Sequence, residues 1–273
     1  MRVLLVTAVF AALLFGWVRW QERAAVFFPT RGIDGYPRGI GLSSEDVFIE
    51  TADGLRLHGW YVQGTSPVTV LWLHGNAGNI VDRLDILEAM TDHLGVSSLL
   101  FDFRGYGISE GRPSERGLYA DAGAAFRWLT GVKGVAPGNV VIYGHSLGTA
   151  VAVDLSLGPG RAAAAAVLES PFTSARGMAR MIYGGLPVHL LLSVRFDNEG
   201  RIGKLSMPLL VIHGEADTVI PIAMGRRVFE AAPEPKRLLA VPGGDHSDCF
   251  LAGGEKYWQA WRDLLDQIQP AES

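Results

Sequence analysis

Six short, almost continuously apolar runs follow one another along most of the chain. They read VTVLWLHG, SSLLFDFRG, NVVIYGHS, AAAVLES, PLLVIHG and KRLLAVPG, and each ends in a polar or glycine-containing turn. Runs that are apolar at every position suit strands that are buried on both faces, as in the centre of a parallel sheet. The pattern therefore predicts six neighbouring central strands.

Stretches with helical spacing of apolar residues lie between these runs. We expect helices over residues 80–94, 114–129, 147–157, 222–231 and 257–268. Strands and helices that alternate along the chain, joined by right-handed crossovers, form a doubly wound sheet with helices on both faces. The predicted fold class is therefore α/β, with a mostly parallel sheet.

An antiparallel addition to this sheet is expected near the amino terminus. The segment DVFIETADGLRLHGWYV holds two apolar stretches on either side of Asp53-Gly54, and Asp-Gly between such stretches is a strong hairpin signal. Residues 24–45 are interrupted repeatedly by glycine and proline, so we expect them to be a linker. The folded domain is then expected over residues 46–269.

The interval from Pro171 to Met207 is too long for one loop and one helix. It contains MARMIYGGLPVHLLLSV, an amphipathic pattern interrupted at Gly184-Gly185 and Pro187. One interpretation is a small cap over residues 171–207, placed above the carboxyl ends of the strands where open α/β sheets bind ligands. The other is an ordinary two-helix crossover, and the pattern does not separate the two.

The first residues differ in kind from the rest. Residues 3–18 form an almost unbroken apolar run, with Arg2 before it and two tryptophans and Arg19 at its end. A helix over this run would be about 24 Å long, short of the roughly 30 Å hydrocarbon core of a bilayer. Interfacial tryptophans and a snorkelling arginine would extend it. We predict an uncleaved membrane anchor over residues 1–23, with a cleaved secretory signal as the alternative.

Composition narrows the range of partners. The 273 residues carry a formal net charge of −4, so no basic surface points to nucleic acid. A single cysteine, Cys249, excludes a disulfide within the chain, and we expect a buried spectator thiol. The glycines of RGYGISEG are one residue off the dinucleotide-binding spacing, and neither a P-loop nor an H-E-x-x-H motif is present. We therefore expect no cofactor and no metal.

One serine occupies a position typical of a nucleophile. The segment VVIYGHSLGTA places Gly144-x-Ser146-x-Gly148 after a predicted strand and before a predicted helix. This is the context of a nucleophile elbow, in which a strained turn lifts the hydroxyl clear of the sheet. A tight turn that merely needs glycine is the alternative.

A serine hydroxyl needs a base, and the base needs an acid. Among seven histidines, His246 stands out because it lies in VPGGDHSDC, the loop after the last predicted strand. Asp217, in VIHGEADTVIP, lies on the loop after the preceding strand, with Glu215 and Asp197 as competing acids. The order Ser146, Asp217, His246 along the chain is that of hydrolases built on an open α/β sheet.

Acyl transfer also needs donors for the oxyanion of the tetrahedral intermediate. The amide of Leu147, next to the serine, is the expected first donor. The second is expected from the loop LHGNAGN after the first central strand, at Asn76 or, as an alternative, at Ala77. A turn loosened by glycine would also account for this loop.

Several of these segments together resemble a known family. LHGNAGN, FDFRGYGISEGRPSERGLYADA, YGHSLGTAVA, ESPFTS, HGEADTVIP and GGDHSD are similar to the membrane-anchored branch of the α/β-hydrolase superfamily, over roughly residues 25–268. That branch includes serine hydrolases related to protein depalmitoylases. The resemblance implies an α/β-hydrolase fold, with Ser146 as nucleophile, Asp217 as acid and His246 as base. One difference is that the amino terminus lacks a cysteine cluster for lipid attachment.

These observations predict a membrane-anchored serine hydrolase that acts on an ester or thioester with a hydrophobic acyl part. The expected partners are an acylated or other small-molecule substrate and the membrane itself. A serine peptidase of the same fold is a second possibility, and a catalytically silent membrane-anchored scaffold is a third. Fold alone does not decide among them, because function depends on the site.

Overall fold

The computed structural model describes residues 16–17, 19–184 and 186–268. Its main feature is an eight-stranded sheet in the order β10-β9-β8-β7-β4-β6-β3-β2, in which β3 runs antiparallel to both its neighbours and the other pairs are parallel. This confirms the predicted mostly parallel sheet with an antiparallel edge hairpin. In chain order the strands are β2 (Ser44–Glu50), β3 (Arg56–Val62), β4 (Thr69–Leu73), β6 (Ser97–Phe101), β7 (Val140–His145), β8 (Ala165–Glu169), β9 (Leu209–Gly214) and β10 (Lys236–Val241).

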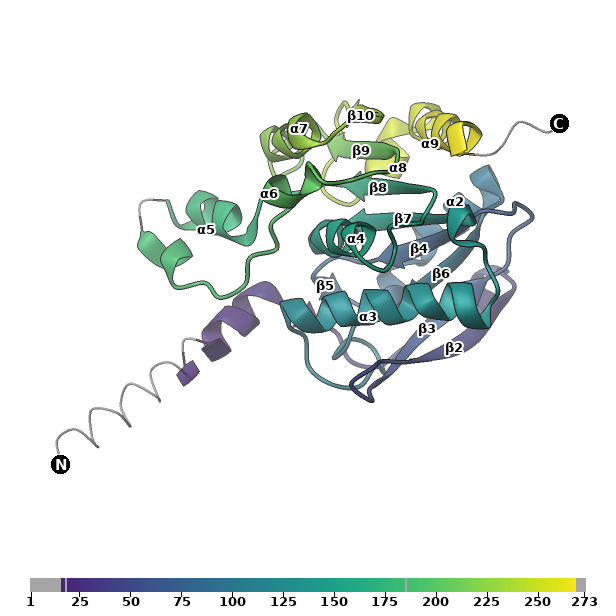
Figure 1. Cartoon of the computed structure of the whole chain (residues 1–273), viewed down its shortest axis with the longest axis horizontal. Coiled ribbons are helices and arrows are strands. Elements are labelled where there is room, and N and C mark those ends of the chain that lie inside the picture. Colours follow the sequence, from purple (N-terminus) through teal and green to yellow (C-terminus); the bar gives the residue numbers. More distant parts are fainter. Residues whose placement is uncertain (1–15, 18, 185, 269–273) are drawn as a thin grey trace.

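Helices cover both faces of this sheet (Figure 1). Those of one face are α3 (Glu115–Arg127), α4 (Leu147–Leu157) and α7 (Ile222–Ala231), and those of the other are α2 (Leu84–Leu94) and α9 (Glu255–Ile268). The predicted helix over 80–94 begins with a 3-10 turn, η2 (Ile80–Arg83), whose start is capped by Asn79 and Asp82. The short helix α8 (Cys249–Gly253) was not predicted, since five residues carry no usable period.

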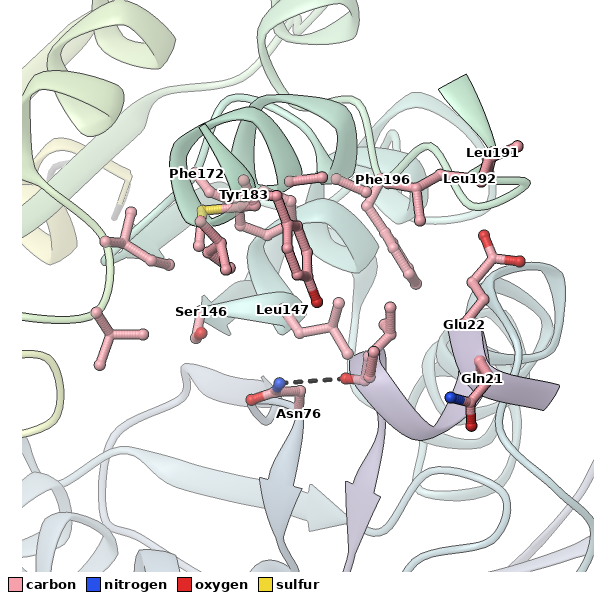
Figure 2. Close-up of a pocket in the computed structure, with 18 of the residues that line it drawn as sticks. Gln21, Glu22, Asn76, Ser146, Leu147, Phe172, Tyr183, Leu191, Leu192 and Phe196 are labelled. Carbon is pink, nitrogen blue, oxygen red and sulfur yellow. Dashed lines mark hydrogen bonds between the residues drawn. The ribbon is translucent and has the colours of Figure 1, made fainter. Parts of the chain in front are cut away.

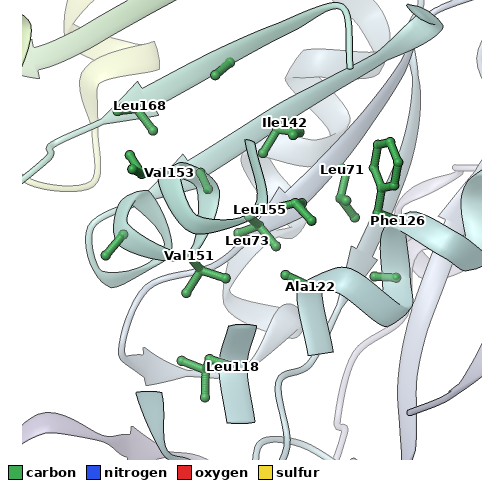
Figure 3. Packing of buried hydrophobic residues seen from close by; sticks show 14 of the residues in the cluster. Leu71, Leu73, Leu118, Ala122, Phe126, Ile142, Val151, Val153, Leu155 and Leu168 are labelled. Atoms are coloured by element: carbon green, nitrogen blue, oxygen red, sulfur yellow. The ribbon is translucent and has the colours of Figure 1, made fainter. Parts of the chain in front are cut away.

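The continuous apolar runs follow from burial on both sides. In β4, Leu71 and Leu73 enter the core under α3 and α4, whereas Val70 and Trp72 enter the core under α2 and α9. Side chains of successive strand residues point to opposite faces, so a strand covered twice needs apolar residues throughout. Figure 3 shows the first of these cores, where strand residues meet α3 and α4.

The expected linker over 24–45 is packed onto the domain. Its strand β1 (Phe28–Pro29) pairs in parallel with β5 (Ala77–Gly78), in the loop after β4, and a 3-10 turn, η1 (Pro37–Ile40), follows. Phe27 is buried in the core. Glycine and proline excluded a long periodic element here, but they left the backbone free to hydrogen-bond with a neighbouring loop.

Most of the predicted anchor over residues 1–23 lies outside the described residues. Residues 19–26 are helical. In the part of the chain that the structure describes, no helix has both the length and the apolar character needed to cross a bilayer.

The long interval 171–207 contains α5 (Ala175–Tyr183), η5 (Pro187–Leu190) and α6 (Glu199–Ile202). Figure 1 shows α5 set apart from the sheet, on the same side as the amino-terminal helix. In α5 only Ala179 is buried, so this helix does not cover a face of the sheet as a crossover helix would. We call residues 175–190 the α5–η5 segment.

Candidate active site

Ser146 stands at the junction of β7 and α4 in a strained conformation. Its φ of 53° and ψ of −118° are unusual for a residue with a side chain. A Cβ on Gly144 would lie 2.5 Å from the carbonyl oxygen of Gly148, and one on Gly148 would lie 1.8 Å from that of Leu73. The turn therefore does need glycine, and it also holds the serine in a strained backbone typical of a nucleophile elbow.

The structure brings the predicted base and acid to this serine. His246 Nε2 lies 2.9 Å from Ser146 Oγ, and His246 Nδ1 lies 2.9 Å from Asp217 Oδ2. The histidine comes from the loop after β10 and the aspartate from the loop after β9. Residues about 100 positions apart along the chain meet because the carboxyl ends of parallel strands share one edge of the sheet.

The carboxylate of Asp217 is fixed by further donors. Its Oδ1 accepts hydrogen bonds from the amides of Val219 (2.9 Å) and Ile220 (2.7 Å). Burial alone would raise the pKa of Asp217, but hydrogen bonds from His213, His246 and the Ile220 amide outweigh it and hold that pKa well below its ordinary value. Asp217 is therefore an anion that can orient His246 and stabilise its protonated form.

The two competing acids lie elsewhere. The Glu215 carboxylate is 4.0 Å from Arg226 at the surface, and Asp197 accepts a hydrogen bond from the Gly200 amide. Of the three candidate acids, the structure places Asp217 beside His246.

Two residues that sequence reasoning missed hold the His246 loop. His145 Nε2 lies 2.9 Å from the carbonyl oxygen of His246, and the Ser170 hydroxyl donates to the same oxygen at 3.3 Å. Burial, together with the positive charge of Arg83, lowers the pKa of His145 to about 3, so its ring is neutral and Nε2–H is the donor. His145 is the last residue of β7 and Ser170 directly follows β8, and a place at a strand end is only a weak signal for such a role.

The loops after β9 and β10 are also joined to each other. Asp245 Oδ1 accepts hydrogen bonds from the amide of Thr218 at 2.7 Å and from the amide of His246 at 2.8 Å. The neighbour of the acid and the neighbour of the base are therefore linked through one carboxylate, which fixes the spacing of Asp217 and His246.

Two backbone amides of residues around the cavity have no hydrogen-bond acceptor of their own in the described part of the chain. Among the described residues, neither the Leu147 amide nor the Asn76 amide donates a hydrogen bond, and both residues line the cavity that Ser146 enters (Figure 2). The Asn76 carbonyl accepts from the Phe28 amide (2.9 Å) and from the Tyr106 hydroxyl (2.8 Å). The Asn76 side chain donates to the Val26 carbonyl. The backbone of Asn76 is thus held from behind, whereas the alternative, Ala77, belongs to β5 and is exposed.

The cavity above Ser146 has a volume of about 410 Å³ and mostly apolar walls. One wall is the inner face of α5, and a second is the amino-terminal helix, with the buried Phe172 and Phe196 between them (Figure 2). The residues of these two helices that line it are Ala175, Met178, Ala179, Ile182 and Tyr183 from α5 and Trp17, Gln21, Glu22, Ala25 and Val26 from the amino-terminal helix. Such a cavity suits the apolar part of a small molecule.

A buried carboxyl group supports the elbow from beneath. The Glu169 carbonyl accepts the Ser146 amide at 2.9 Å, and its side chain accepts the hydroxyls of Tyr257 (2.8 Å) and Tyr143 (3.1 Å). Burial raises the pKa of Glu169 to about 7 against these hydrogen bonds. Across the described residues, no three histidine, cysteine or acidic side chains are grouped so as to hold a metal ion.

Comparisons with known proteins agree with this fold. A family model described as the alpha/beta hydrolase fold matches residues 68–187. An uncharacterized protein of Mycobacterium tuberculosis, Rv2307c, is 40% identical over 272 residues, which cover 97% of this chain and 96% of that protein. The alpha/beta hydrolase domain-containing protein WAV2 of Arabidopsis thaliana is 31% identical over 253 residues, which cover 86% of this chain and 82% of that protein.

Solved structures show the same architecture at lower identity. The Pyrococcus furiosus esterase Pf2001 superposes with a TM-score of 0.73 at 20% identity, covering 89% of this chain and 97% of that one. A thermophilic esterase from Thermogutta terrifontis gives a TM-score of 0.63 at 18% identity, covering 83% of this chain and 100% of that one. Taken with the observed sheet, the matches to sequence and structure place this chain in the α/β-hydrolase superfamily.

Proposed function

We propose that this protein is a serine hydrolase that cleaves carboxylic esters or thioesters with an apolar acyl group. The observation that carries the proposal is the hydrogen-bonded series Ser146–His246–Asp217, which ends at the floor of an apolar cavity. The esterase activity named for the structural relatives supports an ester as the substrate class.

The geometry supports a two-step acyl transfer. As Ser146 Oγ attacks the substrate carbonyl carbon, His246 Nε2 takes the hydroxyl proton, and Asp217 stabilises the imidazolium. The carbonyl oxygen, now an oxyanion, would accept hydrogen bonds from the amides of Leu147 and Asn76. His246 then gives the proton to the departing alcohol or thiol, which leaves an acyl-enzyme. Water, deprotonated by the same histidine, releases the acid and restores Ser146.

The nucleophile can be tested directly. We expect a fluorophosphonate probe to label the wild-type chain and not Ser146→Ala, whereas Ser43→Ala, at an exposed serine, should be labelled as the wild type is. Ser146→Ala should also lose hydrolysis of p-nitrophenyl butyrate while its melting temperature stays close to that of the wild type. A folded wild-type chain that takes up no probe would favour the scaffold alternative.

Two finer points belong to the same proposal. A matched ester and amide of one acyl group separate an esterase from a peptidase, since only the peptidase turns over the amide at a comparable rate. The anchor over residues 1–23 stays a prediction from the apolar run at 3–18. Carbonate extraction tests it: an anchored chain remains in the membrane pellet, and a cleaved or peripheral one is released.

A further inference from the structure

Large apolar side chains are exposed along the α5–η5 segment and just beyond it. Ile182, Leu186, Leu190 and Leu191 are each 59–67% exposed. Single exposed apolar residues are ordinary, but a group of them on one segment is typical of a surface that binds something.

This surface is continuous with the mouth of the cavity above Ser146. Ile182 and Leu191 line the cavity and are exposed at the same time, and so is Trp17 of the amino-terminal helix. Trp20, on the same helix, is 64% exposed. We call these six residues the apolar rim: Trp17, Trp20, Ile182, Leu186, Leu190 and Leu191.

The amino-terminal helix is fixed to the segment that follows η5. Glu22 is buried, and its carboxylate accepts hydrogen bonds from the Ser193 amide, the Ser193 hydroxyl and the Val194 amide. The two parts of the rim therefore keep a set position relative to each other. Figure 1 shows them extending to the same side of the molecule, away from the sheet.

We propose that the apolar rim docks onto a lipid bilayer, so that the cavity opens towards the acyl chains of membrane lipids. The chain itself argues for this occupant, because the apolar run of residues 3–18 reaches the rim at Trp17. Any bilayer that holds this run lies beside the rim. The docking itself does not depend on the proposed function. Only the identity of the molecule that enters the cavity rests on it.

Charge around the rim fits the same occupant. On α5, Arg176 and Arg180 are exposed one turn apart, while Met178 and Ala179 face the cavity. Arg23, on the amino-terminal helix, is exposed as well. Exposed arginines on the elements that also carry exposed apolar side chains are typical of a surface that lies in the interface of an anionic membrane. The substrate class that follows is an acyl ester held in a lipid surface rather than one dissolved in water.

Docking can be measured without any assay of activity. In the full chain with Cys249→Ala, Leu190→Cys carries an environment-sensitive fluorophore and is mixed with phosphatidylcholine–phosphatidylglycerol vesicles that contain doxyl-labelled lipids. The matched control is Val132→Cys, which is 73% exposed and lies in η3 (Trp128–Val132), outside the apolar rim. We expect quenching at position 190 and not at 132. Equal quenching at the two positions, or no quenching at position 190, would overturn the proposal. So would a fluorescence shift at position 190 that needs no vesicles, in a chain that is dimeric in solution.

Access to the cavity can be measured separately. The double variant Leu186→Asp/Leu190→Asp should hydrolyse a long-chain ester presented in the vesicles roughly tenfold more slowly, because buried charge opposes insertion. It should hydrolyse soluble p-nitrophenyl butyrate as the wild type does, and Val132→Asp should change neither rate. If the double variant matched the wild type on both substrates, the docking proposal would be contradicted. If the wild type itself did not hydrolyse p-nitrophenyl butyrate, the proposed hydrolase function would be contradicted instead. The quenching result would still test docking.

Discussion

The hydrogen bonds of Asp217 predict a large loss of kcat for Asp217→Asn. Asp217 Oδ1 accepts the amides of Val219 and Ile220, and Oδ2 accepts His246 Nδ1. An asparagine keeps one of these oxygens and replaces the other by an NH₂ group, so its orientation decides what His246 meets.

The two orientations differ clearly in energy. If the NH₂ group faced the amides of Val219 and Ile220, the part-buried Val219 amide and the buried Ile220 amide would both lose their acceptor, at about 1–3 kcal/mol for the buried one. The asparagine oxygen therefore keeps the amides, and the NH₂ group donates to His246 Nδ1. The histidine proton must then reside on Nε2, which can no longer accept the proton of Ser146. We expect kcat to fall about 10⁴-fold, equivalent to about 5 kcal/mol in the activation free energy.

The assay is steady-state hydrolysis of p-nitrophenyl butyrate, with the melting temperature as a check on folding. Glu215→Gln and Asp197→Asn remove the two competing acids and should each leave kcat within about twofold of wild type, because both carboxylates lie away from His246. If Asp217→Asn kept more than about a tenth of the wild-type kcat, the assignment of Asp217 as the orienting acid would be wrong.

Three other substitutions test the surroundings of the site. Gly148→Ala places a Cβ 1.8 Å from the Leu73 carbonyl oxygen and should lower the free energy of unfolding by about 3 kcal/mol, measured by urea denaturation. Gly158→Ala is the control: the nearest atom to its added Cβ is 3.5 Å away, so the free energy of unfolding should change far less. Glu169 binds a proton more tightly in the folded chain, where its pKa is about 7, so its contribution to stability is lost as pH rises from about 4.5 to 7. Glu169→Gln should remove roughly 3 kcal/mol of this pH dependence of the free energy of unfolding. The measurement is urea unfolding of both chains at pH 5 and at pH 8. Glu22→Ala removes the acceptor for Ser193 and Val194 and should raise KM for a long-chain ester more than for butyrate. The matched control is Glu230→Ala, at an exposed glutamate of α7, which should alter neither KM; equal effects of the two variants would contradict the role of Glu22 in holding the cavity wall.

The sequence by itself determined the sheet and pointed to candidate residues at its edge. Strands covered on both faces leave continuous apolar runs, so the six central strands and the hairpin at Asp53-Gly54 could be recognised locally. The turn at Ser146 is equally local, because its glycines are required by contacts within one strand–helix junction and the strand beside it. The loops that carry Ser146, His246 and the candidate acids were expected at one edge of the sheet, because parallel strands end there.

Only the tertiary structure decided which acid faces His246, what holds its loop and what forms the cavity. Glu215, Asp217 and Asp197 look alike in sequence, since hydrogen bonding to distant side chains leaves no periodic signal. The docking of residues 24–45 onto the loop at Asn76 depends on backbone groups, which every residue carries and no composition reveals. The cavity wall formed by the amino-terminal helix is non-local for the same reason. It exists because Glu22 meets Ser193, about 170 residues away, and that contact is a property of the folded chain rather than of either segment.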